Sequence, residues 1–287
     1  LGELRALAAE LCRERPAVAC SRLPREGGHV MSQQRATILA EGLHFGEGPR
    51  WHEGYLYFSD MHAHALCRWR EGEAVEVVAR FEGPISGLGW QPDGNLLVVS
   101  MLDKQVLRSD GTGAFTLHAD LSGLVPERCN DMVVDAEGGA YVGNFGFDLH
   151  GGGTPQTTVL CYIPRAGGTA SIAAENVAFP NGAVITPDGK TLILGESMGR
   201  CLTAFTIAAP GQLRDRRVFA QFPEGRLPDG ICLDAAGGVW AASPTGDECL
   251  RLEDGGRVTH RVAVSQGAYA CMLGGAEEKT LFILTAA

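Results

Sequence analysis

The sequence predicts an all-β protein, a six-bladed β-propeller, and three observations lead to this prediction. A turn followed by a short apolar run recurs six times, at intervals of roughly 40 to 52 residues, which is the spacing of propeller blades. Within these intervals apolar residues alternate with a period of two, as in strands, and not with the period of a helix. The chain also contains 39 glycines, which favour many tight turns between short strands.

The recurring unit is clearest at residues 227–240. Asp229 stands before a short apolar run, a turn signal follows at residues 234–238, and a second apolar run begins at Val239. This pattern is typical of a β-hairpin whose first strand begins with a carboxylate. Related turns precede second strands at residues 55–58, 96–99, 140–142, 192–194, 239–241 and, in a degenerate sixth copy, 281–283.

The fourth copy shows how a repeat fills four strands. Residues 198–200 and 209–211 are turn signals, residues 201–207 alternate as a third strand, and residues 217–220 form a fourth apolar run. The first and fifth copies have the same skeleton. Four strands per repeat match a propeller blade, and a single flat sandwich is the alternative architecture.

The two ends of the chain differ from the repeats. We expect residues 1–36 to be a leader or an added extension with at most one short helix, because Met31 resembles a natural start. Residues 37–287 then form the propeller. The chain stops directly after the second strand of the sixth copy, so the last blade is expected to be incomplete, and residues 37–41 could supply one of its missing strands.

Composition argues against several classes of partner. The formal net charge is -10 and the isoelectric point is near 5.3, so the surface lacks the excess of Lys and Arg that nucleic acids require. No run of 18 apolar residues occurs, so no membrane span is expected. The nine cysteines contain no CxxC pair, which favours reduced, mostly buried thiols and a cytoplasmic location.

One position of the repeat carries side chains that suit a metal ion. The first strands of a propeller line its central channel, so their starting residues form a ring at one end of the channel. Carboxylate and amide oxygens are the ligands that a hard cation such as calcium prefers. The alternative is that each residue merely caps a local turn. Counted back from the turn glycine, the ring consists of Glu47, Ser86, Asn130, Asn181, Asp229 and, by the weaker sixth copy, Ala270.

Four short motifs surround the polar members of this ring. With these motifs in this order, the chain resembles the family of senescence marker protein (regucalcin), gluconolactonases and luciferin-regenerating enzyme from about residue 38 to its end. The motifs are Glu-Gly-Pro at residues 47–49, Arg-x-Asn-Asp at residues 128–131, Pro-Asn-Gly at residues 180–182 and Pro-Asp-Gly at residues 228–230.

The resemblance implies a six-bladed propeller with one divalent metal ion in its channel. Calcium is the expected ion, and zinc, manganese and magnesium are the alternatives for an oxygen-only site. Asp131 resembles a structural partner more than a ligand. The implied metal ligands are Glu47, Asn181 and Asp229, and the implied substrate-binding residues are Arg128 and Asn130.

The resemblance also implies a metal-dependent hydrolase that opens sugar lactones, as gluconolactonases do. The metal would polarise the lactone carbonyl for attack by a water of lowered pKa. Asp229 would be the general base, and Arg128 and Asn130 would hold the sugar hydroxyls and the developing oxyanion. The rival functions are a non-catalytic propeller that binds calcium or a partner protein, and a phosphotriesterase-like hydrolase on the same scaffold.

Two other features remain open at this level. His62 and His64 follow the second strand of the first copy and are expected at the rim of the channel. The Gly-rich loop at residues 144–153 is either a plain connection or a lid over the site. We expect substrate specificity to lie in the loops over the channel, chiefly residues 143–157 and 60–67.

Overall fold

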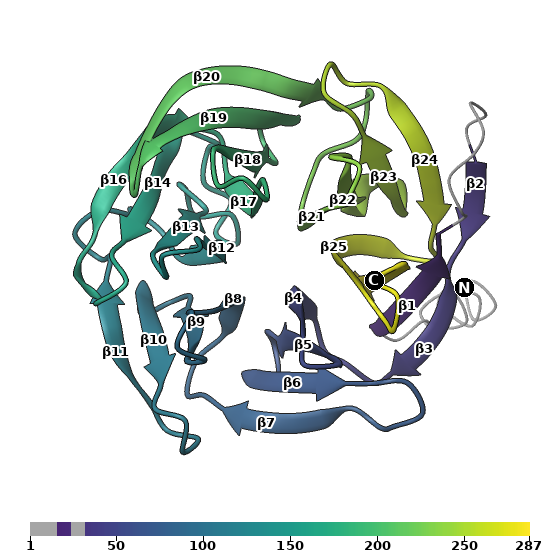
Figure 1. Cartoon of the computed structure of the whole chain (residues 1–287), viewed down its shortest axis with the longest axis horizontal. Helices are drawn as coiled ribbons and strands as arrows, with labels where there is room; N and C mark the ends of the chain where they lie inside the picture. Colours follow the sequence, from purple (N-terminus) through teal and green to yellow (C-terminus); the bar gives the residue numbers. More distant parts are fainter. Residues whose placement is uncertain (1–15, 24–31) are drawn as a thin grey trace, which may run out of the picture.

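The structure is a computed structural model that describes residues 16–23 and 32–287. Six β-sheets stand around one central axis as the blades of a propeller (Figure 1). The predicted all-β, six-bladed fold is confirmed, whereas the short helix expected near the start of the chain lies outside the described residues. Across these described residues, no helix is both long enough and apolar enough to cross a membrane.

The first three blades follow the chain in order from an inner to an outer strand. Blade one contains β4 (Gly46–His52), β5 (Tyr55–Asp60), β6 (Ala65–Trp69) and β7 (Glu76–Arg80). Blade two contains β8 (Ile85–Trp90), β9 (Leu96–Ser100), β10 (Gln105–Ser109) and β11 (Phe115–Asp120), with the short β15 (Gly168–Thr169) parallel to β11. Blade three contains β12 (Cys129–Val134), β13 (Ala140–Asn144), β14 (Thr158–Ile163) and β16 (Ser171–Val177).

The next three blades complete the circle. Blade four contains β17 (Pro180–Ile185), β18 (Thr191–Glu196), β19 (Cys201–Ala209) and β20 (Gln212–Gln221). Blade five contains β21 (Ile231–Leu233), β22 (Val239–Ser243), the short 3-10 helix η1 (Pro244–Gly246), β23 (Glu248–Leu252) and β24 (Val258–Ala263), with β2 (Ser32–Arg35) parallel to β24. Blade six contains β25 (Gly267–Gly274), β26 (Thr280–Ala286), β1 (Ala17–Arg22) and β3 (Thr37–Glu41).

Strand β1 closes the ring. It pairs antiparallel with β26 on one side and with β3 on the other, so the two ends of the chain meet in one sheet (Figure 1). The strand expected at residues 37–41 is present as β3. The expected boundary at residue 37 and the expected incomplete sixth blade differ from the structure, because Val18 and its neighbours in β1 are buried in this blade. The stretch at 17–22 lacks the turn signal of the repeats, and for that reason it was missed.

The inner strands pack against one another around the axis. Each of β4, β8, β12, β17, β21 and β25 contacts the inner strands of both neighbouring blades. The packing is so close that glycine is required: a Cβ atom on Gly87 would lie 2.5 Å from the Met132 nitrogen, and one on Gly182 would lie 2.4 Å from the Ile231 nitrogen. The predicted lining of the channel by the first strand of each repeat is therefore confirmed.

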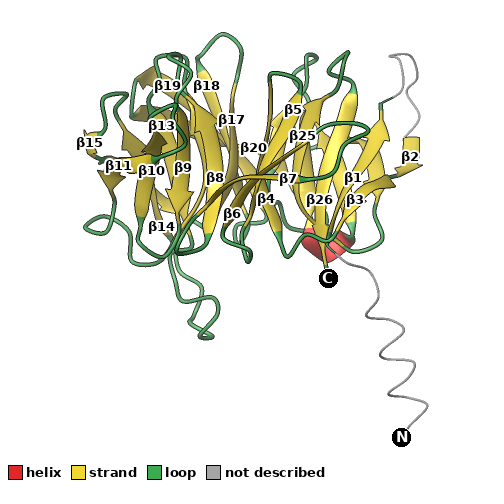
Figure 2. Ribbon diagram, turned by 90° about the horizontal axis from the view of Figure 1, so that it is seen from below, coloured by secondary structure: helices red, strands yellow, loops and turns green. Residues whose placement is uncertain are grey.

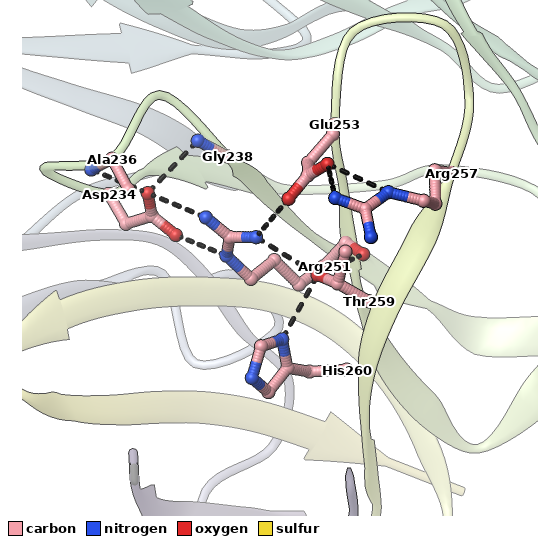
Figure 3. Close-up of polar contacts among 8 residues, drawn as sticks. All are labelled: Asp234, Ala236, Gly238, Arg251, Glu253, Arg257, Thr259 and His260. Atoms are coloured by element: carbon pink, nitrogen blue, oxygen red, sulfur yellow. Dashed lines mark hydrogen bonds and ion pairs between the residues drawn. The ribbon is translucent and has the colours of Figure 1, made fainter. Parts of the chain in front are cut away.

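The hairpin turns at the opposite end of the blades are fixed by aspartates. In blade five Asp234 accepts hydrogen bonds from the backbone nitrogens of Ala236 and Gly238 at 3.0 and 2.9 Å, and it pairs with Arg251 at 2.6 Å (Figure 3). Arg251 also donates to Glu253, in the turn after β23, and to Thr259 on β24. This network holds the turn from β21 to β22 and is separate from the residues that face the channel mouth.

The cysteines carry no disulfide in the described part of the chain. Eight cysteines there are free thiols, as the sequence led us to expect, and most of them are buried. The closest pair is Cys232 and Cys271, whose sulfur atoms lie 3.9 Å apart in the core between blades five and six.

We predict that β1 is required for a stable fold. Deleting residues 1–23 would expose the edge of β26 and remove four buried side chains of β1, so the thermal unfolding midpoint should fall sharply or the protein should aggregate. Deleting only residues 1–15 is the matched control and should leave the midpoint nearly unchanged. Equal midpoints for the two shortened proteins, measured by circular dichroism, would show that β1 does not close the ring.

Candidate metal centre

Irregularities in the inner strands mark the predicted ring. In five of the inner strands the pairing register shifts at the end nearest the channel mouth, which is the signature of a β-bulge. Bulges re-aim side chains and occur frequently beside active sites. The shifts lie between Glu47 and Arg50, Ile85 and Leu88, Cys129 and Met132, Pro180 and Ala183, and Ala268 and Ala270.

The ring lies on one face of the disc. Each inner strand begins where the second strand of its blade ends, so the loops between second and third strands surround the same end of the channel. One of these loops contains η1, and Figure 2 shows η1 together with the C-terminus on a single face. We call this face the mouth face.

Backbone hydrogen bonds define which residues occupy equivalent places in the ring. The nitrogen of Gly182 donates to the carbonyl of Asp229 at 3.3 Å, and the nitrogen of Gly230 donates to the carbonyl of Tyr269 at 2.8 Å. Tyr269 therefore holds in blade six the place that Asp229 holds in blade five. The expected sixth member, Ala270, is wrong: its side chain is fully buried in the core, and β25 contains one more residue between the mouth and the turn than the other copies.

Asn181 is held in place by its neighbours in blades three to five. The side-chain amide of Asn130 donates to the carbonyl of Pro180 at 3.4 Å. The amide nitrogen of Asn181 donates to the hydroxyl of Ser197 at 3.1 Å, and that hydroxyl donates to the carbonyl of Pro228 at 2.7 Å. Because the amide nitrogen is the donor, the amide oxygen of Asn181 is available as a ligand.

Glu47 and Asp229 form a buried acidic pair. Each side chain is only 8% exposed. Burial raises the pKa of Asp229 to about 8, against the lowering effect of a hydrogen bond from Asn181. Burial, followed by the negative charges of Asp229 and Asp131, raises the pKa of Glu47 well above its usual range. Two carboxylates in one low-dielectric place are costly unless a cation joins them.

The donor set fits a hard divalent cation. Within the described ranges, no group of three or more His, Cys, Asp or Glu side chains could hold a metal ion, so the candidate centre depends on amide oxygens as well as carboxylates. Ser86 supports a polar channel, because its buried hydroxyl lacks a hydrogen-bond partner. The ring brings together Glu47, Asn130, Asn181 and Asp229, which offer only oxygen ligands.

The contacts of the Asp131 carboxylate differ from those of the candidate ligands. Its carboxylate accepts from the guanidinium of Arg50 at 3.0 Å and from the backbone nitrogen of Met132 at 2.8 Å. Arg50 follows Glu47 in the inner strand of blade one, so this ion pair joins blades one and three across the channel wall. A carboxylate with two donors of its own is satisfied within the protein, which matches the structural role expected for Asp131.

Two acidic residues that the sequence analysis did not assign to the site position the segments before the ligands. Asp60, at the end of β5, accepts from the backbone nitrogens of His44 and Phe45, directly before Gly46 and Glu47. Glu196, at the end of β18, accepts from the backbone nitrogen of Ala178, shortly before Asn181. Both acids end the second strand of their blade, and this shared repeat position was a signal that could have revealed them.

Residues 195–199 read Gly-Glu-Ser-Met-Gly and match the nucleophile pattern of serine hydrolases. The structural context that this pattern requires, a turn from a strand into a helix, is missing here, because the segment joins strands β18 and β19. The Ser197 hydroxyl is buried and bonded to Asn181 and to the carbonyl of Pro228. The structure therefore favours a positioning role for Ser197 over a nucleophilic one.

The predicted substrate-binding residues lie at the mouth of blade three. Arg128 is half-buried, and its guanidinium lies 5.6 Å from the ring centre of Phe145. Asn130 is buried two residues further along the chain. The contact with this aromatic face restricts the orientation of the Arg128 guanidinium.

The histidines take different positions. His62 is exposed at the mouth face, and its ring lies 5.1 Å from that of Phe45. Burial, together with the nearby histidines His44, His64 and His150, lowers the pKa of His62 against the opposing effect of Asp60. The expectation that His62 lies at the rim is therefore confirmed.

Comparison with known proteins places the chain in a family. Residues 45–287 match the model of the SMP-30/Gluconolactonase/LRE-like region. The chain belongs to this family. It is 26% identical over 254 residues to the pentonolactonase of Haloferax volcanii, and the alignment covers 87% of this chain and 84% of that protein. It is 25% identical over 256 residues to regucalcin from Sus scrofa, which covers 87% and 85% of the two chains.

A solved structure agrees with this family assignment. A gluconolactonase from Xanthomonas campestris superposes with a TM-score of 0.75 and 25% identity, covering 96% of this chain and 99% of that chain. The resemblance predicted from the four motifs is thus confirmed. The names of these relatives include two lactonases and regucalcin.

We predict that the centre binds a divalent cation and that binding stabilises the fold. Adding calcium to chelator-treated protein at about one hundred times its Kd should stabilise it by about 2.7 kcal/mol, which raises the thermal midpoint. Glu47→Gln and Asp229→Asn should remove most of this shift, because each loses a charged ligand. Both should also raise the midpoint of the metal-free protein, because they end the repulsion within the acidic pair.

Asp188→Asn is the control, since Asp188 lies in an exposed turn away from the mouth face. It should leave the metal-induced shift unchanged. If calcium, manganese, magnesium and zinc all fail to move the midpoint of the native protein, the predicted centre does not bind a metal.

Proposed function

We propose that this protein is a metal-dependent lactonase that opens sugar lactones. The observation that carries the proposal is the buried pair of Glu47 and Asp229 beside Asn181, at a channel mouth that also presents Arg128. In the described part of the chain neither carboxylate forms an ion pair with a basic side chain, which suits a metal centre, and the lactonase names among the relatives supply the reaction class.

Glu47, Asn181 and Asp229 would hold the ion, with Asn130 close by. Calcium is our first choice, because the donors are all oxygens and two of them are carboxylates, and zinc, manganese and magnesium are the alternatives. When bound, a divalent cation supplies Lewis-acid polarisation of a carbonyl and lowers the pKa of water.

Asp229 is the residue we assign as general base. Its carboxylate would take a proton from the attacking water and return it to the ring oxygen when the bond between that oxygen and the acyl carbon breaks. Water and lactone are thereby converted into an open-chain hydroxy acid, with no other reactant. The backbone of Asp229 is held in place by hydrogen bonds from its nitrogen to Ala242 and from Gly182 to its carbonyl.

Arg128 and Asn130 would bind the substrate. The guanidinium of Arg128 can donate to the substrate carbonyl or hydroxyls, and its contact with Phe145 restricts its orientation. Donors that are fixed before the reaction contribute most where negative charge develops. We therefore assign these residues to orientation of the lactone and stabilisation of the oxyanion.

The first test is hydrolysis of glucono-1,5-lactone, followed by pH-stat titration and corrected for spontaneous opening. Metal-loaded protein should accelerate hydrolysis, a chelator should abolish the acceleration, and Asp229→Asn should lower kcat by at least about a hundredfold. Asp188→Asn should keep full activity. Metal binding without hydrolysis of any lactone would instead identify a non-catalytic calcium-binding propeller.

A second test separates binding from folding at Arg128. Arg128→Ala should lower kcat/KM by about a hundredfold, because a fixed donor near the oxyanion is lost. The metal-induced rise in thermal midpoint should remain, since Arg128 is not assigned as a ligand. Arg214→Ala is the control, because Arg214 pairs with Asp215 on the exposed outer strand β20 of blade four. Equal kcat/KM values for the two variants would exclude Arg128 from the site.

A further inference from the structure

Aromatic side chains form one wall of the channel mouth. The rings of Phe45 and Tyr269 lie 4.5 Å apart and join blades one and six, and Phe45 also contacts His62 at 5.1 Å. Tyr269 adjoins Asp229, because the backbone nitrogen of Gly230 donates to the carbonyl of Tyr269 at 2.8 Å. Burial and the charges of Asp229 and Glu47 raise the pKa of Tyr269. This wall therefore reaches from the candidate metal centre outward to the exposed rim.

A second aromatic group lies on the other side of the ring, in blades three and four (Figure 1). The rings of Phe145 and Phe179 stack with centres 4.6 Å apart, and Phe147 packs against Phe179. Arg128 lies over Phe145, so the polar group that we assign to the substrate rests on an apolar base. All three phenylalanines are buried, so on this side the aromatic rings form a base beneath Arg128 and not an exposed wall.

Exposed aliphatic residues continue this apolar surface on the mouth face. Nine large hydrophobic side chains are exposed in the described part of the chain, and six of them lie on the outermost strands of blades. The other three all lie in loops between second and third strands, which surround the mouth. They are Leu102 at 54%, Leu149 at 40% and Met198 at 39% exposure, in blades two, three and four.

Two of these three residues lie on loops that contact segments next to the site residues. The backbone nitrogen of Met198 donates to the carbonyl of Ala178, close before Asn181. Leu149 lies between Phe147 and His150, and the ring of His150 lies 6.1 Å from that of Phe145. A molecule bound at the metal centre could therefore extend outward across Leu149 or Met198.

We propose that, among the lactones that this site opens, those with an apolar substituent, alkyl or aryl, are preferred, because the substituent leaves the mouth along this surface. The inference rests on the proposed lactonase function and specifies its substrate class. The lactone ring and its polar groups would meet Arg128 and Asn130, and the substituent would cover the exposed side chains of Leu149 and Met198. A fully hydroxylated sugar lactone could not use this surface, whereas each methylene group of an alkyl chain gains from burial there.

The test compares three lactones with the metal-loaded full-length protein. They are glucono-1,5-lactone, δ-valerolactone and δ-decalactone, and the last two differ only by a pentyl chain. We expect kcat/KM for δ-decalactone to exceed that for δ-valerolactone by about tenfold or more. Leu149→Ser and Met198→Ser should each reduce this ratio at least about threefold, mainly through KM, because they remove apolar contacts to the chain.

Leu117→Ser is the matched control, since Leu117 is 57% exposed on the outer strand β11. It should leave the ratio unchanged. Calorimetric binding of the ring-opened products gives a measurement without turnover, and 5-hydroxydecanoate should bind more tightly than gluconate.

The outcomes separate the two proposals. The inferred substrate class would be wrong if glucono-1,5-lactone were hydrolysed fastest of the three. It would also be wrong if neither Leu149→Ser nor Met198→Ser changed the ratio of kcat/KM between δ-decalactone and δ-valerolactone. Either result would leave the lactonase proposal intact. Failure to open any of the three lactones would overturn the lactonase proposal itself, and the substrate class with it.

Discussion

Close packing of the six inner strands around the axis is the constraint on which the rest of the structure depends. Where Gly87 and Gly182 meet the backbone of the next blade, no Cβ atom fits, so neighbouring strands approach at backbone distance. This approach fixes the bulges at the same height and gathers residues from distant parts of the chain into one ring. The candidate centre is therefore a property of the closed ring and not of any single blade.

Other buried acids in this protein show why the pair at the centre is unusual. Asp131 is paired with Arg50, Glu196 with Arg216, and Glu248 with Arg226, so each of these charges is neutralised within the fold. Glu47 and Asp229 instead repel each other. The other buried carboxylates have basic partners within the protein, whereas a cation from solution would neutralise this pair. That contrast is the physical basis of the metal assignment.

The sequence predicts most of this arrangement because the repeat has a fixed phase. Counting from the turn glycine found Glu47, Asn130, Asn181 and Asp229 without any structure. The same counting failed at Ala270, because β25 is one residue longer between mouth and turn, and it missed Tyr269 beside the acidic pair. It also failed at β1, whose role depends on pairing with a strand more than two hundred residues away and leaves no local pattern.

The division between ring and loops has a consequence for specificity. The ligand positions are tied to inner strands by backbone hydrogen bonds and bulges, so they tolerate little change. The loops after the second strands carry no such constraint, and their tips can change chemistry without moving the ring. Leu149 and Met198 lie on those loops, whereas Asn130 lies in the inner strand β12 and Arg128 directly precedes it. The shared chemistry of the centre and the choice of substrate are thus controlled by different parts of the same blades, and the apolar loop tips are where this chain can differ from relatives that open sugar lactones.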